Sequence, residues 1–311
     1  DTTKVLNYYP NIPCNDVTDL VNKINEERPY LQASYDGTKI DDKYYYVPFY
    51  SSSTLMFIRK DKFEEAGITK MPETWDEVFE DAKKVSDPDN DFYGLAMGCG
   101  ENDDDDENTI RQYMWNEGGY LFNEDGEIVA DDKVTAVFDK YAELYKDKVI
   151  PQDATTWDAG GNNGSYLAGR TAICFNAPTL YNALVSDEQY KELLDNTVVL
   201  APPAGNENSV YMNFNRGFAV MNTCKDTDLA SDVISYLLDK DWYDSYMEEI
   251  APVFAPVFED AKENTTVAAK HYFTYPFVKA VNQVATGTAD SSEALKSMTA
   301  AIEDFQDQVG E

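Results

Sequence analysis

Aromatic and amide side chains recur at the ends of predicted strands, and they are the residues best suited to chemistry in this sequence. Four stretches combine aromatic rings with amide, hydroxyl or guanidinium groups: residues 49–52, 176–181, 211–217 and 272–275. Sugars offer apolar CH faces to rings and many hydroxyl groups to amides and arginine. Each stretch alone is also typical of a core or a loop, but their recurrence at strand ends favours a carbohydrate cleft.

The sequence motifs of several enzyme classes are absent. The chain contains no G-x-x-x-x-G-K-[ST], no G-x-G-x-x-G after a strand, no G-x-S-x-G and no H-E-x-x-H. The single histidine, His271, excludes sites that need two or three imidazoles, and we interpret it as a surface or structural residue. The sequence therefore predicts neither an enzyme nor a cofactor. The alternative is a glycan-active enzyme whose two carboxylates lie about 5–9 Å apart, but the many carboxylates single out no pair.

One acidic stretch has the spacing of a calcium-binding loop. Asp87, Asp89 and Asp91 occupy positions 1, 3 and 5 of an EF-hand-type loop. Position 6 is Phe92 where that loop needs glycine, and position 12 is Gly98 where it needs a bidentate glutamate. A polar turn between a helix and a strand is therefore favoured, and the three aspartates are only a weak metal candidate.

The composition is that of an acidic globular protein. The 311 residues include 58 Asp and Glu against 25 Lys and Arg, a formal net charge of −33. This charge excludes a nucleic-acid partner, because phosphate contacts need clustered positive charge. Hydrophobic residues make up 43% of the chain, enough for a buried core, and the length is typical of two domains. The acidic run at 103–106 is interpreted as a solvated loop.

Strand and helix patterns alternate along most of the chain, which predicts an α/β fold. One helix begins at Thr74, where Glu77 completes a capping box, and Gly67 ends the helix before it. The predicted strands are 44–50, 55–58, 93–97, 171–175, 198–201 and 217–221. The other predicted helices are 60–66, 109–117, 134–145, 228–238 and 292–309. In helix 228–238, capped by Asp226 or Asp228, the residues predicted to face inward are Leu229, Val233, Leu237 and Leu238.

The order of these segments resembles the extracellular solute-binding proteins of ABC importers, in the maltose-binding-like group that mostly carries oligosaccharides. The resemblance covers residues 16–311 and includes PETWDE at 72–77, WNEGGY at 115–120 and NAP at 176–178. The remaining segments that carry it are 36–51, 55–61, 66–68, 93–97, 167–173, 200–203 and 235–238. No single motif is decisive, but their order matches that of the family.

The resemblance implies a two-lobe, periplasmic-binding-protein-like (type II) α/β architecture. The N-terminal lobe would comprise 1–51 and 217–250, and the C-terminal lobe 54–212 and 254–311. Hinge crossings are expected near 50–54, 212–216 and 251–254, and the lobes would close on a ligand beyond the carboxyl ends of their strands. Family members usually begin with two or three further βα units, so the first lobe is expected to be incomplete.

The resemblance also implies a function and a set of ligand-binding residues. The protein would capture an oligosaccharide or other carbohydrate and deliver it to membrane permease subunits, acting as a monomer. Asn108 and Arg111 are one helical turn apart and are therefore expected to face one groove. The residues expected to bind ligand are Tyr50, Ser51, Ser52, Asn108, Arg111, Asn176, Thr179, Tyr181, Asn213, Asn215, Arg216, Tyr272 and Tyr275. The alternatives are binding of a peptide or polyamine, and a structural or adhesive surface protein.

Two further expectations follow from the resemblance. Cys99 and Cys174 are the pair expected to form a disulfide, if one exists, because the family places their strands in one sheet; the alternative is four reduced thiols. The protein is expected to be extracellular, either periplasmic or a cell-surface lipoprotein. Cys14 lies inside the folded region, so a lipid-bearing cysteine would have to lie upstream of Asp1.

Overall fold

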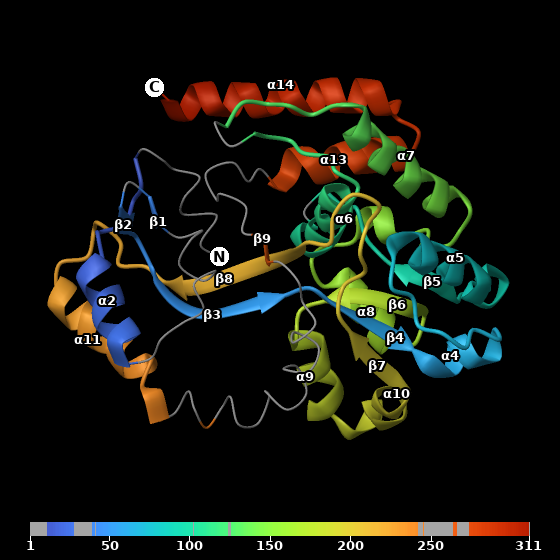
Figure 1. The fold of residues 1–311 in the computed structure, drawn as a ribbon, viewed down its shortest axis with the longest axis horizontal. Coiled ribbons are helices and arrows are strands. Elements are labelled where there is room, and N and C mark those ends of the chain that lie inside the picture. Colours follow the sequence, from blue (N-terminus) through green and yellow to red (C-terminus); the bar gives the residue numbers. More distant parts are fainter. Residues whose placement is uncertain are drawn as a thin grey trace. The chain divides into compact units, whose positions relative to one another are not determined.

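The computed structural model describes residues 11–27, 39–40, 42–101, 103–123, 126–241, 245, 264–265 and 274–310 (Figure 1). The chain divides into two compact units. Unit 1 comprises Asp1–Ser53, Met212–Tyr272 and Asp307–Glu311, and unit 2 comprises Thr54–Tyr211 and Phe273–Gln306. The expected crossing at 251–254 lies outside the described residues, as do His271 and Tyr272.

Unit 2 is built on a four-stranded sheet with the order β5-β6-β4-β7. β6 is parallel to β5 and antiparallel to β4, and β4 is antiparallel to β7. Since β5 and β6 are parallel, their carboxyl ends lie at the same edge of the sheet. The strands are β4 (Leu55–Arg59), β5 (Tyr93–Ala96), β6 (Thr171–Asn176) and β7 (Thr197–Leu200), which confirms the four predicted strands in this part of the chain.

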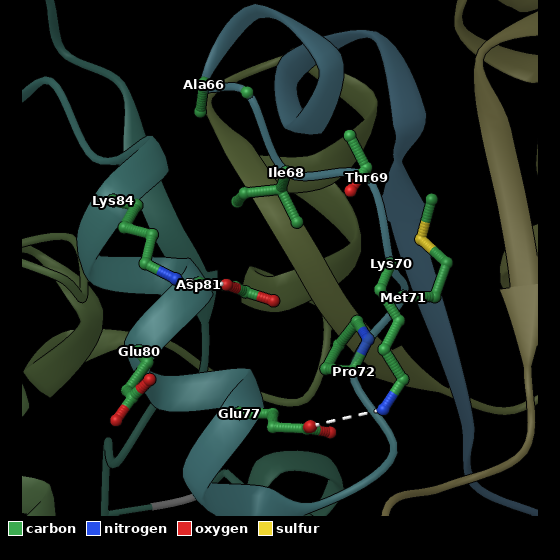
Figure 2. A pocket seen from close by; sticks show the side chains of 11 residues that line it. Ala66, Ile68, Thr69, Lys70, Met71, Pro72, Glu77, Glu80, Asp81 and Lys84 are labelled. Atoms are coloured by element: carbon green, nitrogen blue, oxygen red, sulfur yellow. Dashed lines mark hydrogen bonds and ion pairs between the residues drawn. The ribbon is translucent and has the colours of Figure 1, made fainter.

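Two short helices connect β4 to β5, as predicted. Gly67 takes a left-handed conformation, with φ of 74°, just after α4 (Lys60–Glu65). α5 (Trp75–Val85) starts with a complete capping box, in which Thr74 accepts from Glu77 N and the Glu77 carboxylate accepts from Thr74 N. Glu77 also pairs with Lys70 at 3.3 Å on the wall of a surface pocket (Figure 2).

The core of unit 2 is aromatic. Trp75 is buried, and its ring stacks on Phe175 of β6 with 4.8 Å between centroids. Its centroid lies 5.7 Å from that of Phe79 and 5.2 Å from that of Tyr113, so one indole joins α5, α6 (Asp104–Asn116) and the sheet. Offset and tilted ring contacts of this kind add to the burial of apolar area.

The acidic run at 103–106 is the start of α6, so its interpretation as a solvated loop is wrong. The Asp103 carboxylate caps the helix by accepting from Asp106 N at 3.0 Å, and both side chains are 0% exposed. Aspartate is a strong N-cap, and negative charge is favourable in the first turn of a helix. α6 therefore begins at Asp104, five residues before the predicted position.

The other helices of unit 2 complete the layers around the sheet. α7 (Asp132–Lys146) confirms the prediction for 134–145, and α13 (Thr274–Ala285) packs against it and against α6 (Figure 1). α14 (Ser291–Gly310) buries Met298 and Ile302. The remaining helical segments are α8 (Gly161–Leu167), α9 (Thr179–Ser186), α10 (Lys191–Asp195), η1 (Pro88–Asn90), η2 (Ala154–Thr156) and η3 (Glu188–Tyr190). No helix among the described residues has the length and apolarity of a membrane span.

Unit 1 contains a sheet with the order β3-β8-β9 and a two-stranded ladder, β1-β2. β3 (Val47–Ser53) and β8 (Tyr211–Phe218) are antiparallel, with an irregular register between Pro48 and Tyr50. A proline has no N–H for the ladder, which accounts for an irregularity beside it. The other elements are β1 (Lys39–Ile40), β2 (Lys43–Tyr44), β9 (Asn264–Thr265), α2 (Thr18–Glu27) and α11 (Thr227–Leu237).

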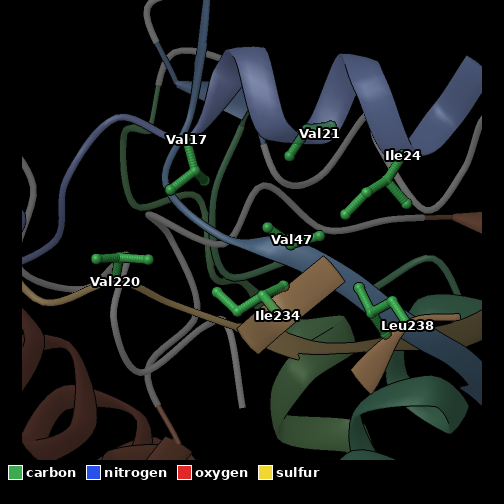
Figure 3. Packing of buried hydrophobic residues seen from close by; sticks show 7 residues of the cluster. All are labelled: Val17, Val21, Ile24, Val47, Val220, Ile234 and Leu238. Carbon is green, nitrogen blue, oxygen red and sulfur yellow. The ribbon is translucent and has the colours of Figure 1, made fainter. Parts of the chain in front are cut away.

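A small apolar cluster holds α2 and α11 onto β3 (Figure 3). Val21 and Ile24 of α2 meet Val47 of β3 and the pair Ile234 and Leu238. The members of the cluster are Val17, Val21, Ile24, Val47, Val220, Ile234 and Leu238.

The predicted inward face of α11 is largely wrong. Leu229, Val233 and Leu237 are 58%, 49% and 46% exposed, whereas Leu238 is buried as predicted. Residues 229, 233 and 237 form one row along the helix surface, and residues 234 and 238 form the next row, one residue further around the helix. Only the second row contacts the apolar cluster of α2 and β3. Asp226 is the N-cap, accepting from Leu229 N at 3.0 Å.

All four cysteines are free thiols, which is the alternative to a disulfide between Cys99 and Cys174. In the parallel ladder Cys174 is opposite Ala96, and Cys99 lies three residues farther along the chain. Three residues of extended chain span roughly 10 Å. A disulfide needs Cα atoms within about 7 Å of each other.

Gly94 of β5 is required by the close approach of α5. A Cβ atom at Gly94 would lie 2.0 Å from Ala82 O, whereas one at Gly164 of α8 would meet nothing within 4 Å. Gly94→Ala should therefore lower the free energy of unfolding by about 1–3 kcal/mol. Gly164→Ala, the matched control, should raise it by about 0.5–1 kcal/mol, because alanine favours a helix interior. Urea unfolding of both variants measures this, and equal effects of the two changes would contradict the packing argument.

Candidate functional site

A network of polar side chains, joined by one backbone N–H group, lies at the carboxyl ends of β5 and β6. The chain continues from β5 into α6 and from β6 into α9, and α8 precedes β6. We call this network the polar edge; it consists of Gly98, Asp103, Asp106, Asn162, Asn163, Asn176 and Thr179. Crevices at the carboxyl ends of parallel strands are the usual ligand sites of open α/β sheets.

Asn176, the last residue of β6, is the centre of the amide part of the polar edge. Its Nδ2 donates to Asn162 Oδ1 at 3.2 Å and also to Asn163 Oδ1. Its Oδ1 accepts from Thr179 Oγ1 at 3.4 Å. Asn176 is buried, whereas Asn163 is partly exposed and Thr179 is exposed. The structure thus brings two predicted residues, Asn176 and Thr179, together and holds the first in one orientation.

The Asp106 carboxylate ties the amides to β5 and α6. Asn162 Nδ2 donates to Asp106 Oδ1 at 2.8 Å and to the Phe175 carbonyl at 3.3 Å. The backbone N–H of Gly98 donates to Asp106 Oδ2 at 2.6 Å. Glycine is needed here because a Cβ atom at Gly98 would lie 2.2 Å from Asp103 Oδ2 and 2.8 Å from Asp106 Oδ2.

Both acidic side chains of the polar edge bind their protons more tightly than aspartate in water. Burial raises the pKa of Asp103 to about 7, and hydrogen bonds to Asp106 oppose the rise. Burial followed by repulsion from Asp103 raises the pKa of Asp106 well above its ordinary value, against the donors Gly98 and Asn162. Desolvation penalises the charged form of a carboxyl group. Ionisation of both Asp103 and Asp106 at the same time is therefore unfavourable.

Trp157 is a residue that the sequence reasoning missed. It is partly exposed, and its indole packs directly on Gly161. The contact is so close that a Cβ atom at Gly161 would lie 2.4 Å from Trp157 Cγ. On the other side, Trp157 Cε3 would be 3.2 Å from a Cβ atom at Gly98. Burial of Asp153 opposes its ionisation, but Arg170 and then Trp157 outweigh this and lower the pKa of Asp153. A tryptophan just before a glycine- and asparagine-rich stretch was the available signal.

Arg111 faces the interior of unit 2 rather than an open groove. Its side chain pairs with Glu107, and its guanidinium lies 4.6 Å from the ring centroid of Phe277 on α13. The residue is 2% exposed. Burial raises the pKa of Glu107 to about 8 and outweighs the attraction of Arg111. The predicted neighbour Asn108 is also buried, and its Nδ2 donates to the Asp104 carbonyl at 2.6 Å.

The other predicted residues of unit 2 lie on helices. Tyr181 is partly exposed in α9, two residues after Thr179, and Tyr275 is exposed in the first turn of α13. Tyr181 therefore belongs to the same helix start as the polar edge.

The predicted residues of unit 1 lie on the paired strands β3 and β8. In the ladder Tyr50 is opposite Arg216, Ser51 is opposite Asn215, and Ser53 is opposite Asn213. Ser52 is opposite Phe214, and Arg216 is exposed. The backbone thus brings these residues together as a second group, within unit 1.

Two aspartates of the weak calcium candidate have other partners within the protein. Asp91 has a left-handed conformation, with φ of 54°, and accepts two hydrogen bonds from Arg170 at 3.0 Å. Asp87 accepts from Asn90 Nδ2 at 2.6 Å and forms a backbone bridge with Phe92. These contacts make the polar turn that was the alternative. Across the part of the chain that the structure describes, no three His, Cys, Asp or Glu residues form a group that could hold a metal ion.

Two surface pockets lie away from the predicted residues. One, of about 420 Å³, lies between the 66–72 loop and α5, and both of its lysines are paired, Lys70 with Glu77 and Lys84 with Asp81 (Figure 2). The other, of about 360 Å³, lies in unit 1 at the starts of α2 and α11. Neither is lined by a predicted ligand-binding residue.

The chain belongs to the bacterial extracellular solute-binding proteins, since the model of that family matches residues 15–244. The family consists of binding proteins that act outside the cytoplasm.

Curated relatives are longer than this chain. Putative binding proteins of Brucella abortus and Brucella suis are 27% identical over 223 residues, which are 68% of this chain and 51% of theirs. A mannitol-binding protein of Pseudomonas aeruginosa is 37% identical over 78 residues, 23% of this chain and 18% of its own length. The chain thus spans about half the length of the Brucella relatives.

Solved structures share the fold. A maltose-bound protein of T. maritima has a TM-score of 0.78 at 20% identity, covering 97% of this chain and 82% of its own. A solute-binding protein of Thermotoga lettingae bound to α-D-tagatose has a TM-score of 0.83 at 16% identity, with the same coverage. The expected type II α/β fold of two-lobe periplasmic binding proteins is therefore confirmed.

Arg111→Met tests whether Arg111 is structural. The change leaves Glu107 buried without its cation, which should lower the free energy of unfolding by about 3 kcal/mol. The loss should grow above pH 8, because Glu107 without Arg111 keeps its folded-state proton to higher pH than in the wild type, where its pKa is about 8. Urea unfolding at pH 7 and pH 9 measures both effects.

Arg170→Met is the matched control for this experiment. Arg170 also pairs with two carboxylates, Asp91 and Asp153, but in a solvent-exposed cluster. Its loss should cost less than about 1 kcal/mol. Equal losses in the two variants would contradict a buried, structural Arg111.

Proposed function

We propose that this protein captures a carbohydrate outside the cell membrane and delivers it to the permease of an ABC importer. The family match supports capture of a solute, and the polar edge supports a sugar as that solute. Relatives point the same way: one is a mannitol-binding protein, another a diacetylchitobiose-binding protein, and a neighbouring structure holds ribitol.

The observation that carries the proposal is the fixed amide cluster beside an indole. Asn162, Asn163 and Asn176 hold one another in defined orientations, and Trp157 packs against Gly98 and against Gly161, the residue before Asn162. Fixed amides and hydroxyls bind sugar hydroxyls, and a partly exposed aromatic ring packs against the CH face of a sugar. Preorganised polar groups of this kind lose little entropy on binding.

The same geometry argues against a glycan-active enzyme. Hydrolysis of a glycosidic bond needs two carboxyl groups on either side of the bond. The two carboxyl groups of the polar edge, Asp103 and Asp106, have no exposed surface, and Asp106 is occupied by two donors. We therefore propose binding without catalysis.

We further propose that Tyr50, Ser51, Ser52, Asn213, Asn215 and Arg216 supply ligand contacts from unit 1. Their strands are paired where the chain changes unit, with Ser53 opposite Asn213. Such paired crossing strands are suited to act as hinges near 50–54 and 212–216. The proposed setting is extracellular, in the periplasm or on a cell-surface lipoprotein, with the permease as partner and the binding protein as a monomer.

A ligand panel tests the function. Maltose, maltotriose, chitobiose, mannitol and ribitol should be compared with tripeptides and spermidine by thermal shift and calorimetry. At least one carbohydrate or polyol should raise Tm and bind with no product released, because a ligand that binds only the folded state stabilises it. Released sugar would favour the enzyme, stabilisation by peptide or spermidine alone would favour another solute, and no stabilisation would favour a structural protein.

Alanine substitutions test the proposed contacts. Trp157→Ala, Tyr181→Ala and Arg216→Ala should each weaken binding of the stabilising sugar by about tenfold, as loss of a ring contact or a charge-assisted hydrogen bond predicts. The Tm of ligand-free Tyr181→Ala and Arg216→Ala should change little. Tyr236→Ala, which removes an 82% exposed ring on α11, is the control and should bind normally. Unchanged affinity in all three variants would contradict the assignment.

A further inference from the structure

Two buried carboxyl groups meet at the start of α6. Asp103 Oδ2 and Asp106 Oδ2 lie 2.2 Å and 2.8 Å from the same point, the position of a Cβ atom on Gly98. Neither side chain has exposed surface. The two oxygens are therefore no more than 5.0 Å apart. Two ionised carboxylates this close repel each other strongly in a medium of low dielectric constant.

The hydrogen bonds leave one oxygen of the pair without a donor. Asp106 accepts from Asn162 Nδ2 and from Gly98 N, and Asp103 Oδ1 accepts from Asp106 N. Asp103 Oδ2 has no N–H or O–H donor among the described residues. A buried anionic oxygen without a donor is unfavourable. A proton on this oxygen removes the charge and gives Asp103 a hydrogen bond to donate to Asp106.

Among the described residues, the charged groups that act most on the pair are carboxylates, which do not stabilise a second ionisation. On α6 the neighbours are Asp104 and Asp105. The thiols of Cys99 and Cys174 and the Tyr141 phenol face the pair from the segment after β5, from β6 and from α7, and all three are neutral at pH 7. Asn282 of α13, also neutral, donates to Cys99 O at 2.7 Å.

We propose that Asp103 and Asp106 share one proton, and that this protonated pair positions Asn162 and Asn176 for ligand binding. Ionisation of the pair at alkaline pH loosens the bonds of Asp106 to Gly98 and Asn162, which disorders the polar edge and weakens binding. Asp103 is therefore a positioning residue and does not contact ligand. The effect on affinity rests on the proposed function, whereas the shared proton and its effect on the polar edge do not.

The sign of the pH effect follows from linkage. The folded protein keeps the proton to higher pH than the unfolded chain, in which aspartate has its ordinary pKa. Between the two pKa values the unfolded chain binds fewer protons, so raising the pH favours unfolding. The contribution of the pair to stability is complete at acid pH and is lost as the pH rises from about 4 through neutrality.

Asp103→Asn removes one of the two titrating groups, and with it the repulsion on Asp106, and keeps the geometry. Asparagine is as good an N-cap as aspartate, and its amide supplies a permanent donor toward Asp106. Asp105→Asn is the matched control, since it removes a partly exposed carboxylate from the same turn.

The first measurement is urea unfolding of the ligand-free full chain at pH 5 and pH 8. The folded-to-unfolded ratio of the wild type should fall at least about tenfold more than that of D103N over this interval, since one pKa unit is tenfold. The D105N control should follow the wild type. Parallel pH profiles for the wild type and D103N would overturn the shared proton.

The second measurement is amide hydrogen exchange at Gly98 and across 157–163, comparing wild type with D103N at equal pH so that intrinsic exchange cancels. At pH 8.5 the wild type should exchange about tenfold faster than D103N, and at pH 6 the two should agree. A ratio independent of pH would overturn the link to the polar edge. A protein that shows both pH effects yet binds no carbohydrate of the panel would refute the proposed function alone.

Discussion

Unit 2 is organised around a carboxyl group that is withdrawn from solvent. Asp106 accepts from the backbone after β5 and from Asn162 at the start of α8, while its own N–H donates to the cap of α6. The parallel pairing of β5 and β6 brings these segments to one edge, and Gly98 permits the approach. Asn162 donates to the Asp106 carboxylate and in turn accepts from Asn176. The positions of both asparagines therefore depend on this carboxyl group.

The acidic residues of this protein fall into two groups, one on the surface and one buried. Most of the 58 carboxylates give a surface charge that keeps the protein soluble. Asp103, Asp106 and Glu107 are instead buried at the N-cap and in the first turn of one helix. Glu107 has a cation, Arg111, whereas the aspartates have hydrogen-bond donors and each other. The same residue type therefore serves solubility, helix capping and the placement of neighbouring amides.

A rigid polar edge suits a protein whose task is to recognise a solute. The amides of Asn162, Asn163 and Asn176 are oriented by one another before any ligand arrives, and the indole of Trp157 is held between two glycines. Orientation before binding limits the entropy that binding must overcome.

Local patterns in the sequence determined the α/β class, the strands of unit 2 and the capping box at Thr74, because they depend on residues a few positions apart. The order of motifs also indicated the family, which the match over 15–244 established. Tertiary structure decided which polar residues are buried. The acidic run is a buried helix start and not a solvated loop, and Arg111 packs against Phe277 and not in a groove. On α11, the row predicted to be buried is exposed. Trp157 joined the polar edge only because Gly98 and Gly161, 63 positions apart, both leave room for its ring. Periodicity in the sequence shows which residues share one face of a helix or strand. Whether that face is buried depends on segments far away in the sequence that pack against it.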